Sequence, residues 1–242
     1  ASQGGDIVQA ENLLKEGEAL AGMRRFPEAV ARHQQGLAIF ERTLGTTHAD
    51  FIRQLDLAAR TYERFVQPDC AAVFLERKVQ AQRVSLAPLL STLKASPPVS
   101  GGGRSGSRPA ARPALHHTQT AQVSDYIGTL VRLARAYYRG GFLDKAGEVF
   151  AQTLALEKEI HWDQTHVYMW TLTEVAEYHR WTRKWNEAEA ALHQALAIRA
   201  DTATKREQAM CARLALANIY LIQKRFDEAD RITRETLALL DG

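Results

Sequence analysis

The sequence contains few cysteines, few prolines and no long hydrophobic run. Its only cysteines, Cys70 and Cys211, stand far apart in 242 residues, which excludes a disulfide scaffold and favours a reducing compartment. No run of about 18 apolar residues occurs, so a transmembrane helix is excluded. The first residues, 1–5, have neither the basic nor the apolar region of a signal peptide. They also lack a methionine, which suggests a processed chain or a piece of a longer one.

Acidic residues are absent from one long stretch of the chain. Residues 77–124 contain seven lysines and arginines but no aspartate or glutamate, so all 28 acids lie elsewhere. The protein is therefore a mildly acidic body with a basic insert, which is not the pattern of a nucleic-acid-binding protein. The basic insert suits an acidic partner surface.

Proline is concentrated in the same region. Five of the seven prolines fall within residues 88–113, beside three consecutive glycines at 101–103. Such a segment cannot bury enough apolar surface to offset its ordering entropy, so we expect a flexible insert over residues 95–121. It is either a solvated linker or a basic docking or phosphorylation segment, since Ser105 and Ser107 each lie beside an arginine.

Outside the insert, the hydrophobic pattern predicts helices throughout. Apolar residues recur at three- and four-residue spacing, as in residues 130–137, and strand-like alternation is nowhere sustained. Pro27 and Pro68 fall at the expected first turn of a helix, where a missing N–H costs nothing. The sequence therefore predicts an all-α protein.

A pair of small residues twelve positions apart recurs five times. The pairs are Gly17 with Ala29, Ala59 with Ala71, Ala134 with Ala146, Ala176 with Ala188, and Ala217 with Ala229. An aliphatic residue follows the second member by eight positions each time: Leu37, Val79, Leu154, Leu196 and Leu237. Small residues let two antiparallel helices approach closely, and the aliphatic residue is expected to fill the seam with the next pair. The pattern predicts an α–α solenoid of about five helical hairpins.

The repeating unit resembles the tetratricopeptide repeat. The third unit carries the resemblance most fully, with Leu133, Ala134, Tyr137, Gly141, Ala146, Phe150 and Leu154. Successive units are about 42 residues apart rather than the usual 34, apart from one interval that holds the insert. The long connecting segments at 44–50 and 161–166 are similar to those of the kinesin light chain type. That resemblance implies a cytoplasmic adaptor whose concave groove binds peptide segments.

The sequence divides into three parts. Residues 7–93 are expected to form the first two hairpins, residues 95–121 the insert, and residues 122–242 the last three hairpins. We expect a further repeat, a capping helix or a partner to cover the end of the fifth hairpin, where Ile232, Leu237 and Leu240 would lie partly exposed.

The first helices of the hairpins carry the candidate partner-binding residues. In a superhelix of this type the first helices line the concave side, and Arg, Tyr and Trp dominate binding energy at interfaces. The candidates are Arg132, Arg135, Tyr138, Arg139, Trp170, Glu174, Glu177, Arg180, Trp181 and Asn218. The kinesin light chain type usually has an Asn pair in each first helix, whereas this chain has residues 131–132, 173–174 and 214–215 there, none of them asparagine.

Catalytic and metal-binding patterns are missing. His161, Asp163 and His166 are close in sequence, but they fall in a connecting segment where a structural or capping role is favoured over a metal site. No nucleophile or metalloprotease motif occurs, and the glycine cluster is not followed by the Lys of a phosphate loop. We expect no enzyme activity, no cofactor and no metal.

The leading hypothesis is therefore a non-catalytic scaffold or adaptor that binds protein or peptide segments in its groove. Two alternatives remain open: a structural component of a cytoskeletal or ciliary assembly, and the sensor domain of a larger regulator. We expect a cytoplasmic, cytoskeleton-associated protein with no membrane and no nucleic-acid partner. The identity of the partner and the oligomeric state are not encoded in these patterns.

Overall fold

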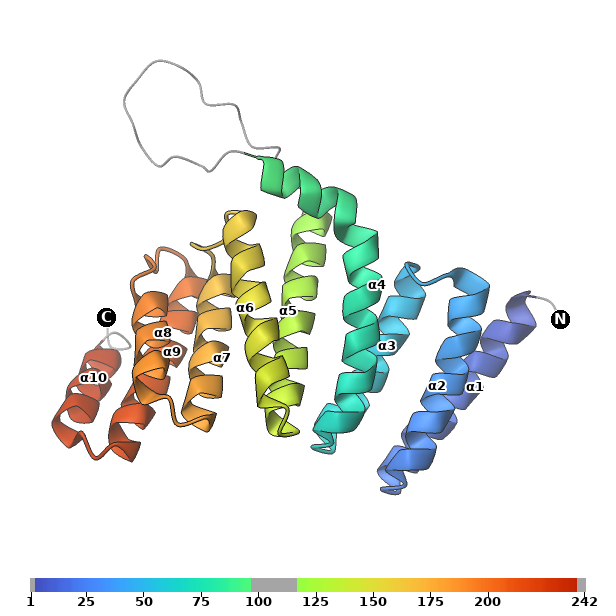
Figure 1. Cartoon of the computed structure of the whole chain (residues 1–242), viewed down its shortest axis with the longest axis horizontal. Helices are drawn as coiled ribbons and strands as arrows, with labels where there is room; N and C mark the ends of the chain where they lie inside the picture. The colour runs from blue at the N-terminus through green and yellow to red at the C-terminus, as the bar shows by residue number, and fades with distance from the viewer. Residues whose placement is uncertain (1–2, 97–116, 239–242) are drawn as a thin grey trace, which may run out of the picture. The chain divides into compact units, whose positions relative to one another are not determined.

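The computed structural model describes residues 3–96 and 117–238, and within them ten helices and no strand are found (Figure 1). The helices are α1 (Gln3–Gly22), α2 (Phe26–Leu44), α3 (Ala49–Arg64), α4 (Pro68–Ala95), α5 (His117–Arg139), α6 (Leu143–Glu159), α7 (His166–Trp181), α8 (Trp185–Leu196), α9 (Ala203–Ile222) and α10 (Phe226–Ala238). The all-α prediction is confirmed.

The chain folds into two compact units, which are described separately. The first comprises Ala1–Leu89 and Gln119–Phe142, and so holds α1 to α3, most of α4 and most of α5. The second comprises Leu90–Thr118 and Leu143–Gly242, and holds the end of α4 together with α6 to α10. The third predicted hairpin is thus divided, with α5 in one unit and α6 in the other. Of the expected insert at 95–121, residues 117–121 begin α5, and 97–116 lie outside the described residues.

The ten small residues of the predicted pairs, Gly17 and nine alanines, are buried throughout. Seven of the nine alanines have at most 1% of their surface exposed, and Gly17 has no room for a Cβ atom. A Cβ on Gly17 would come within 2.9 Å of the His33 ring on α2. Close approach of α1 to α2 therefore requires glycine at this position.

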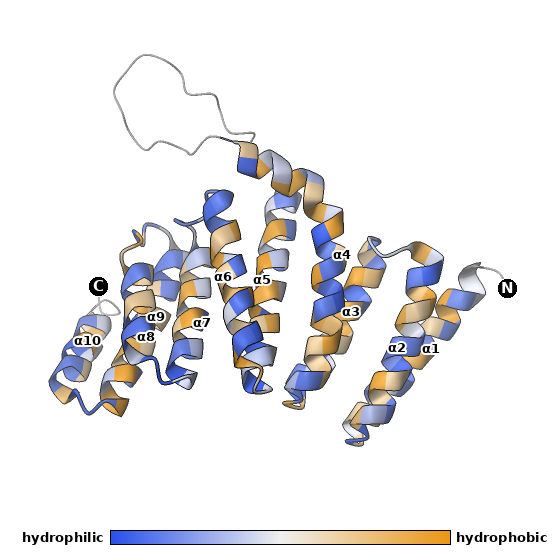
Figure 2. Cartoon of the chain, viewed as in Figure 1, coloured by the Kyte–Doolittle hydropathy of each residue, from blue (hydrophilic) through white to orange (hydrophobic). Residues whose placement is uncertain are grey.

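An aromatic cluster forms the core of the first unit. The rings of Tyr62 and Phe74 are stacked with centroids 5.4 Å apart, and the His33 ring meets both edge-on. The His33 Nδ1 atom also lies 2.8 Å from the Tyr62 hydroxyl, which satisfies two polar groups that burial would otherwise strand. This cluster joins α2, α3 and α4. Figure 2 shows the accompanying pattern, with hydrophobic and hydrophilic residues alternating around each helix.

The aliphatic column predicted to fill the seam is only partly correct. Leu37 is buried, but Val79, Leu154 and Leu196 are half-buried and Leu237 is 55% exposed. The buried column lies one residue earlier, at Gly36, Lys78, Thr153, Ala195 and Thr236. The second helix of each hairpin is therefore rotated so that these residues, several of them polar, face the interior. Ile232, expected to be partly exposed, is buried, whereas Leu237 is exposed as expected. Leu240 lies outside the described residues.

A left-handed turn recurs at the end of each first helix. Arg24, Val66, Arg183 and Lys224 have φ between 56° and 60°, and Gly141 takes the corresponding position after α5. Among these, Val66 is the one β-branched residue, and its side chain is 71% exposed. A β-branched residue in this conformation is strained, and its exposed side chain returns little burial energy.

We predict that Val66→Gly stabilises the protein by about 1 kcal/mol, because glycine adopts positive φ without strain. Urea unfolding of the full chain measures the change. The matched control is Val84→Gly, at a valine inside α4 that is also well exposed; this variant should lose about 0.5–1 kcal/mol of stability. Equal destabilisation by both substitutions would show that the turn at Val66 is unstrained.

A buried carboxyl group lies in the core of the second unit. Glu157 on α6 is fully buried, and neither carboxyl oxygen has a hydrogen-bond partner among the described residues. Burial raises the pKa of Glu157 to about 8, and the hydroxyl of Thr171 opposes this only in part. Glu157 is therefore largely protonated in the folded chain at neutral pH.

The raised pKa of Glu157 predicts that the second unit loses stability as the pH rises. Between the usual value of 4.5 and about 8, the unfolded chain ionises this group while the folded chain keeps its proton, so unfolding is favoured increasingly. We expect Glu157→Gln to remove most of this dependence and to be more stable than the wild type at pH 8 by roughly 2 kcal/mol.

Thermal unfolding of both chains at pH 5 and pH 8 checks this expectation. Glu148→Gln, an exposed glutamate on the same helix, provides the control. The idea fails if wild type and Glu157→Gln show the same change between the two pH values.

Candidate binding site

The candidate site lies in the first unit, around an ion network centred on Asp56 of α3. Its carboxylate accepts hydrogen bonds from Arg60 on the same helix at 2.6 Å, from Lys78 on α4 at 2.9 Å, and from Arg132 on α5. Arg132 also makes a bidentate pair with Glu63, at 2.9 and 2.8 Å. The Asp56 carboxylate therefore connects three helices. The two parallel hydrogen bonds from Arg132 to Glu63 hold α5 to α3 as well.

Lys78 explains why this network forms. Its side chain is only 2% exposed, and a buried ammonium group is costly unless it is paired. The Lys78 Nζ donates to Asp56 and, at 3.1 Å, to Asp125 on α5. Gln82, one turn later on α4, donates to the other oxygen of Asp125 at 2.7 Å. Burial of one lysine thus positions carboxylates from two neighbouring helices.

The electrostatics of Asp56 follow from its partners. Burial alone would raise the pKa of its carboxyl group, but hydrogen bonds from Arg60, Lys78 and Arg132 outweigh burial and hold the pKa well below its usual value. Asp56 is ionised at every pH near neutrality. Its contribution to stability is therefore present above its usual pKa of 3.8 and is lost only as the pH falls towards the lowered value.

A basic pocket opens beside Arg132. The pocket has a volume of about 370 Å³ and lies among the end of α3, the start of α4 and α5. Its charged lining comprises Arg60, Glu63, Arg132, Arg135 and Arg139. Four arginines against one glutamate give this pocket an excess of positive charge. We refer to it below as the basic pocket.

The structure brings three of the predicted site residues to this pocket, namely Arg132, Arg135 and Arg139. Arg139 is exposed at the end of α5, whereas Arg132 is committed to the ion network. Tyr138 corrects the expectation, because its side chain is 1% exposed and offers no surface to a partner. Tyr138 and Arg139 are adjacent on α5 and therefore point in different directions around the helix, the tyrosine into the core and the arginine to the surface.

The remaining candidates lie in the second unit. On α7, Glu177 accepts a hydrogen bond from Arg180 at 2.7 Å, Trp181 is 51% exposed, and Trp170 and Glu174 are half-buried. Asn218 is exposed on α9, which packs against α7. Their role in binding stays a prediction.

The connecting-segment histidines have structural contacts. His48 caps α3, since its Nδ1 accepts the backbone N–H of Asp50 at 3.2 Å. The Nε2 of His161 lies 3.0 Å from the carbonyl oxygen of Ser96, and Thr165 rather than His166 caps α7. Across 3–96 and 117–238, no group of three His, Cys, Asp or Glu residues is arranged to hold a metal ion. In the same ranges, no helix combines the length and apolar character needed to span a bilayer.

Comparisons with known proteins define the class. A family model described as tetratricopeptide repeat matches residues 17–50 and 169–202. A comparison with curated proteins finds no match. Two crystal structures of nearly identical TPR-like repeats, from a Podosopora anserina protein assigned as a kinesin light chain, share 20% identity with this chain. The first has a TM-score of 0.58 and aligns over 96% of this chain and 94% of its own; the second has 0.57, with 97% and 96%.

A third structure, BtubC (BKLC) from P. vanneervenii, has a TM-score of 0.56 at 14% identity and covers all of this chain and 93% of its own. These similarities show the fold of the part of the chain that the structure describes. The chain therefore has a tetratricopeptide-like fold, and two of its segments match the tetratricopeptide repeat family. Its repeats resemble the kinesin light chain type, as their spacing predicted.

We predict that Asp56→Ala destabilises the protein by about 3–5 kcal/mol, because it leaves Lys78 buried without one of its two carboxylates. Asp50→Ala is the matched control. Asp50 is an exposed aspartate on the same helix, paired with Arg53, and its loss should cost about 1 kcal/mol or less. Denaturant titration of the two variants measures the difference. Similar losses from both variants would show that the Asp56 network contributes little.

Proposed function

We propose that this chain is a non-catalytic protein-interaction scaffold, and that its basic pocket binds an acidic side chain or chain segment of a partner protein. The tetratricopeptide fold is typically a protein-binding scaffold, which supports the general role. The observation that carries the finer proposal is the lining of the basic pocket by four arginines and one glutamate. Guanidinium groups match carboxylates in geometry and charge.

The ion network prepares the pocket for this role. Because Asp56 and Glu63 fix the Arg132 guanidinium, the wall beside α5 is ordered before a partner arrives. An ordered wall lowers the entropy lost on binding. Arg135 and Arg139, one turn apart on α5, then extend the positive surface along the helix. The exposed side chain of Val66 adds an apolar contact at the same pocket.

One structural neighbour is described as a kinesin light chain, which supports the proposal that this chain acts at the cytoskeleton. The candidates on α7 and α9 provide a second surface in this proposal, with the exposed Trp181 as its aromatic contact.

We predict that an eight-residue peptide of alternating glutamate and alanine binds the full chain and that raising the salt concentration weakens it. The double substitution Arg135→Ala with Arg139→Ala should weaken binding at least about tenfold, since two charge-assisted contacts are lost. Fluorescence anisotropy of the labelled peptide measures both effects.

The matched control is the double substitution Arg42→Ala with Arg53→Ala, which removes the same charge from exposed positions outside the basic pocket. A general attraction between a basic protein and an acidic peptide would weaken both double variants equally. That result would contradict a role for the basic pocket.

A further inference from the structure

Three of the exposed large hydrophobic residues of the second unit lie on one helix, α9. They are Leu214, Leu221 and Ile222, each between 45% and 55% exposed. Cys211 and Asn218 are exposed on the same side of the helix, because residues three, four or seven positions apart share a helix face. We refer to these five residues as the α9 face. Contiguous exposed apolar surface of this kind marks an interaction site.

The α9 face carries no charge. Between residues 208 and 222 the only charged residue is Arg213, which is half-buried and lies away from this face. A helix that meets only water ordinarily presents charged and polar side chains instead. The first helix of the chain, α1, does so with Gln9, Asn12 and Glu16, which are all exposed. The two helices therefore present outer surfaces of different character.

The repeat relates the α9 face to contacts made in other hairpins. Leu214 and Leu221 stand three residues before and four residues after Ala217, the first small residue of the fifth pair. The corresponding positions of α3 are Asp56 and Glu63, counted in the same way from the second pair. Equivalent positions in a repeat protein make equivalent contacts between neighbours.

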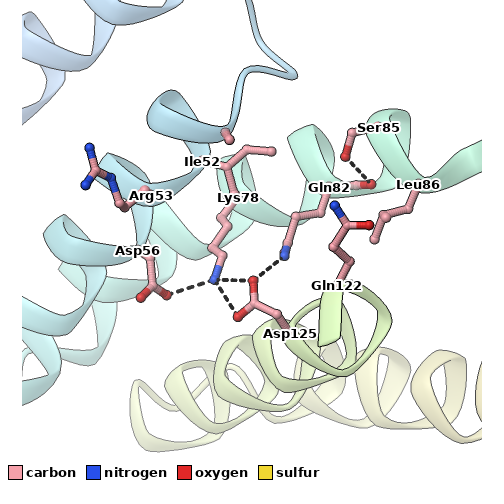
Figure 3. Close-up of a pocket in the computed structure, with 10 residues that line it drawn as sticks. Ile52, Arg53, Asp56, Lys78, Gln82, Ser85, Leu86, Gln122 and Asp125 are labelled. Carbon is pink, nitrogen blue, oxygen red and sulfur yellow. Dashed lines mark hydrogen bonds and ion pairs between the residues drawn. The ribbon is translucent and has the colours of Figure 1, made fainter. Parts of the chain in front are cut away.

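In α3 these positions receive the next first helix. Asp56 and Glu63 both accept hydrogen bonds from Arg132 of α5, and Figure 3 shows Asp56 where α3, α4 and α5 meet. In α5 the corresponding residues, Val131 and Tyr138, are fully buried. On α9, by contrast, both positions are apolar and exposed. The α9 face is therefore the surface with which a first helix of this repeat receives a further helix.

The α9 face is complementary to itself. Asn218 lies at its middle, four residues after Leu214 and three before Leu221. When a second α9 lies antiparallel across it, with a two-fold axis beside Asn218, Leu214 of each copy meets Leu221 of the other. In the same arrangement the small Ala215 meets Ile222. The two Asn218 carboxamides meet at the axis, where each can donate to the oxygen of the other.

A head-to-tail contact between copies is less favourable. It would place the outer surface of α1 on the α9 face, and so bury Gln9, Asn12 and the ion pair of Glu16 with Arg32 against leucine side chains. One helix face is also smaller than the roughly 800 Å² that each partner of a stable complex buries, so we expect a weak dimer, with a Kd that is roughly micromolar or weaker.

We propose that two copies of the chain associate through the α9 face, antiparallel about a two-fold axis beside Asn218. A second copy is then the partner at the α9 part of the second surface described above, an assignment that rests on that part of the proposed function. The basic pocket on the first unit takes no part in this contact.

Sedimentation equilibrium of the full chain between about 1 µM and about 500 µM measures the association. The average mass should rise from that of one chain towards that of two and then level off. A chain that stays monomeric throughout would overturn the proposal and leave the α9 face to a different protein. Continued growth beyond two chains would also overturn it, because a two-fold contact closes on itself.

A matched pair of variants locates the contact. Leu214→Glu should weaken dimerisation at least about tenfold, because it buries a carboxylate without a partner. Leu57→Glu, at a leucine of α3 that is 51% exposed, should leave dimerisation unchanged. Both substitutions lie at exposed helix positions and replace one good helix former by another, so both chains should stay folded. Equal weakening by the two variants would contradict a contact through α9.

Dimerisation and peptide binding are separable. Leu214→Glu should bind the acidic peptide as the wild type does, and the Arg135→Ala, Arg139→Ala double variant should dimerise as the wild type does. Peptide binding that persists in a chain that never dimerises would contradict the α9 contact alone. Dimerisation without peptide binding would support the α9 contact and contradict the role of the basic pocket.

Oxidative cross-linking tests the antiparallel arrangement. Asn218→Cys, in a chain whose two native cysteines are replaced by serine, should form a disulfide-linked dimer, because the two positions meet at the axis. A chain that keeps only Cys211 should not, since seven residues on each side of the axis separate the two thiols by about 20 Å. Cross-linking through Cys211 but not through Asn218→Cys would overturn the proposal.

Discussion

The burial of Lys78 is the constraint on which the first unit depends. An ammonium group with 2% of its surface exposed must be paired, and its partners come from the helices on both sides. Asp56 then gathers Arg60 and Arg132, and Arg132 brings in Glu63. The same chain of contacts orders the wall of the basic pocket. Packing of α5 and preparation of a binding surface therefore have one physical origin.

Asp56 and Glu157 contribute to the pH dependence of stability in opposite directions. In the first unit, the lowered pKa of Asp56 means that stabilisation is lost only on strong acidification. In the second unit, burial of Glu157 favours its protonated form, so a rise in pH is destabilising. The contrast follows from partners rather than from burial alone. Asp56 has three cationic donors, whereas neither oxygen of Glu157 has a partner among the described residues.

Much of the fold could be predicted from the sequence because close helix packing needs small residues at fixed spacing. Gly17 and its alanine counterparts are buried as that argument requires. The ion network could not be predicted, since Lys78 pairs with residues 22 and 47 positions away. A lysine beside the apolar Val79 is ordinarily expected to be solvated, and only the helix phase shows that it points inward. Tyr138 was misplaced for the same reason, by one position on α5.

If Asp56 joins α3, α4 and α5 into one cooperative unit, loss of its contact with α5 should destabilise all three helices. Native-state hydrogen exchange on the full chain tests it most directly, by comparing wild type with Arg132→Met. Slowly exchanging amides in all three helices should open with the same free energy, and the substitution should lower this free energy for all three together. Faster exchange in α5 alone, with α3 and α4 unchanged, would contradict it.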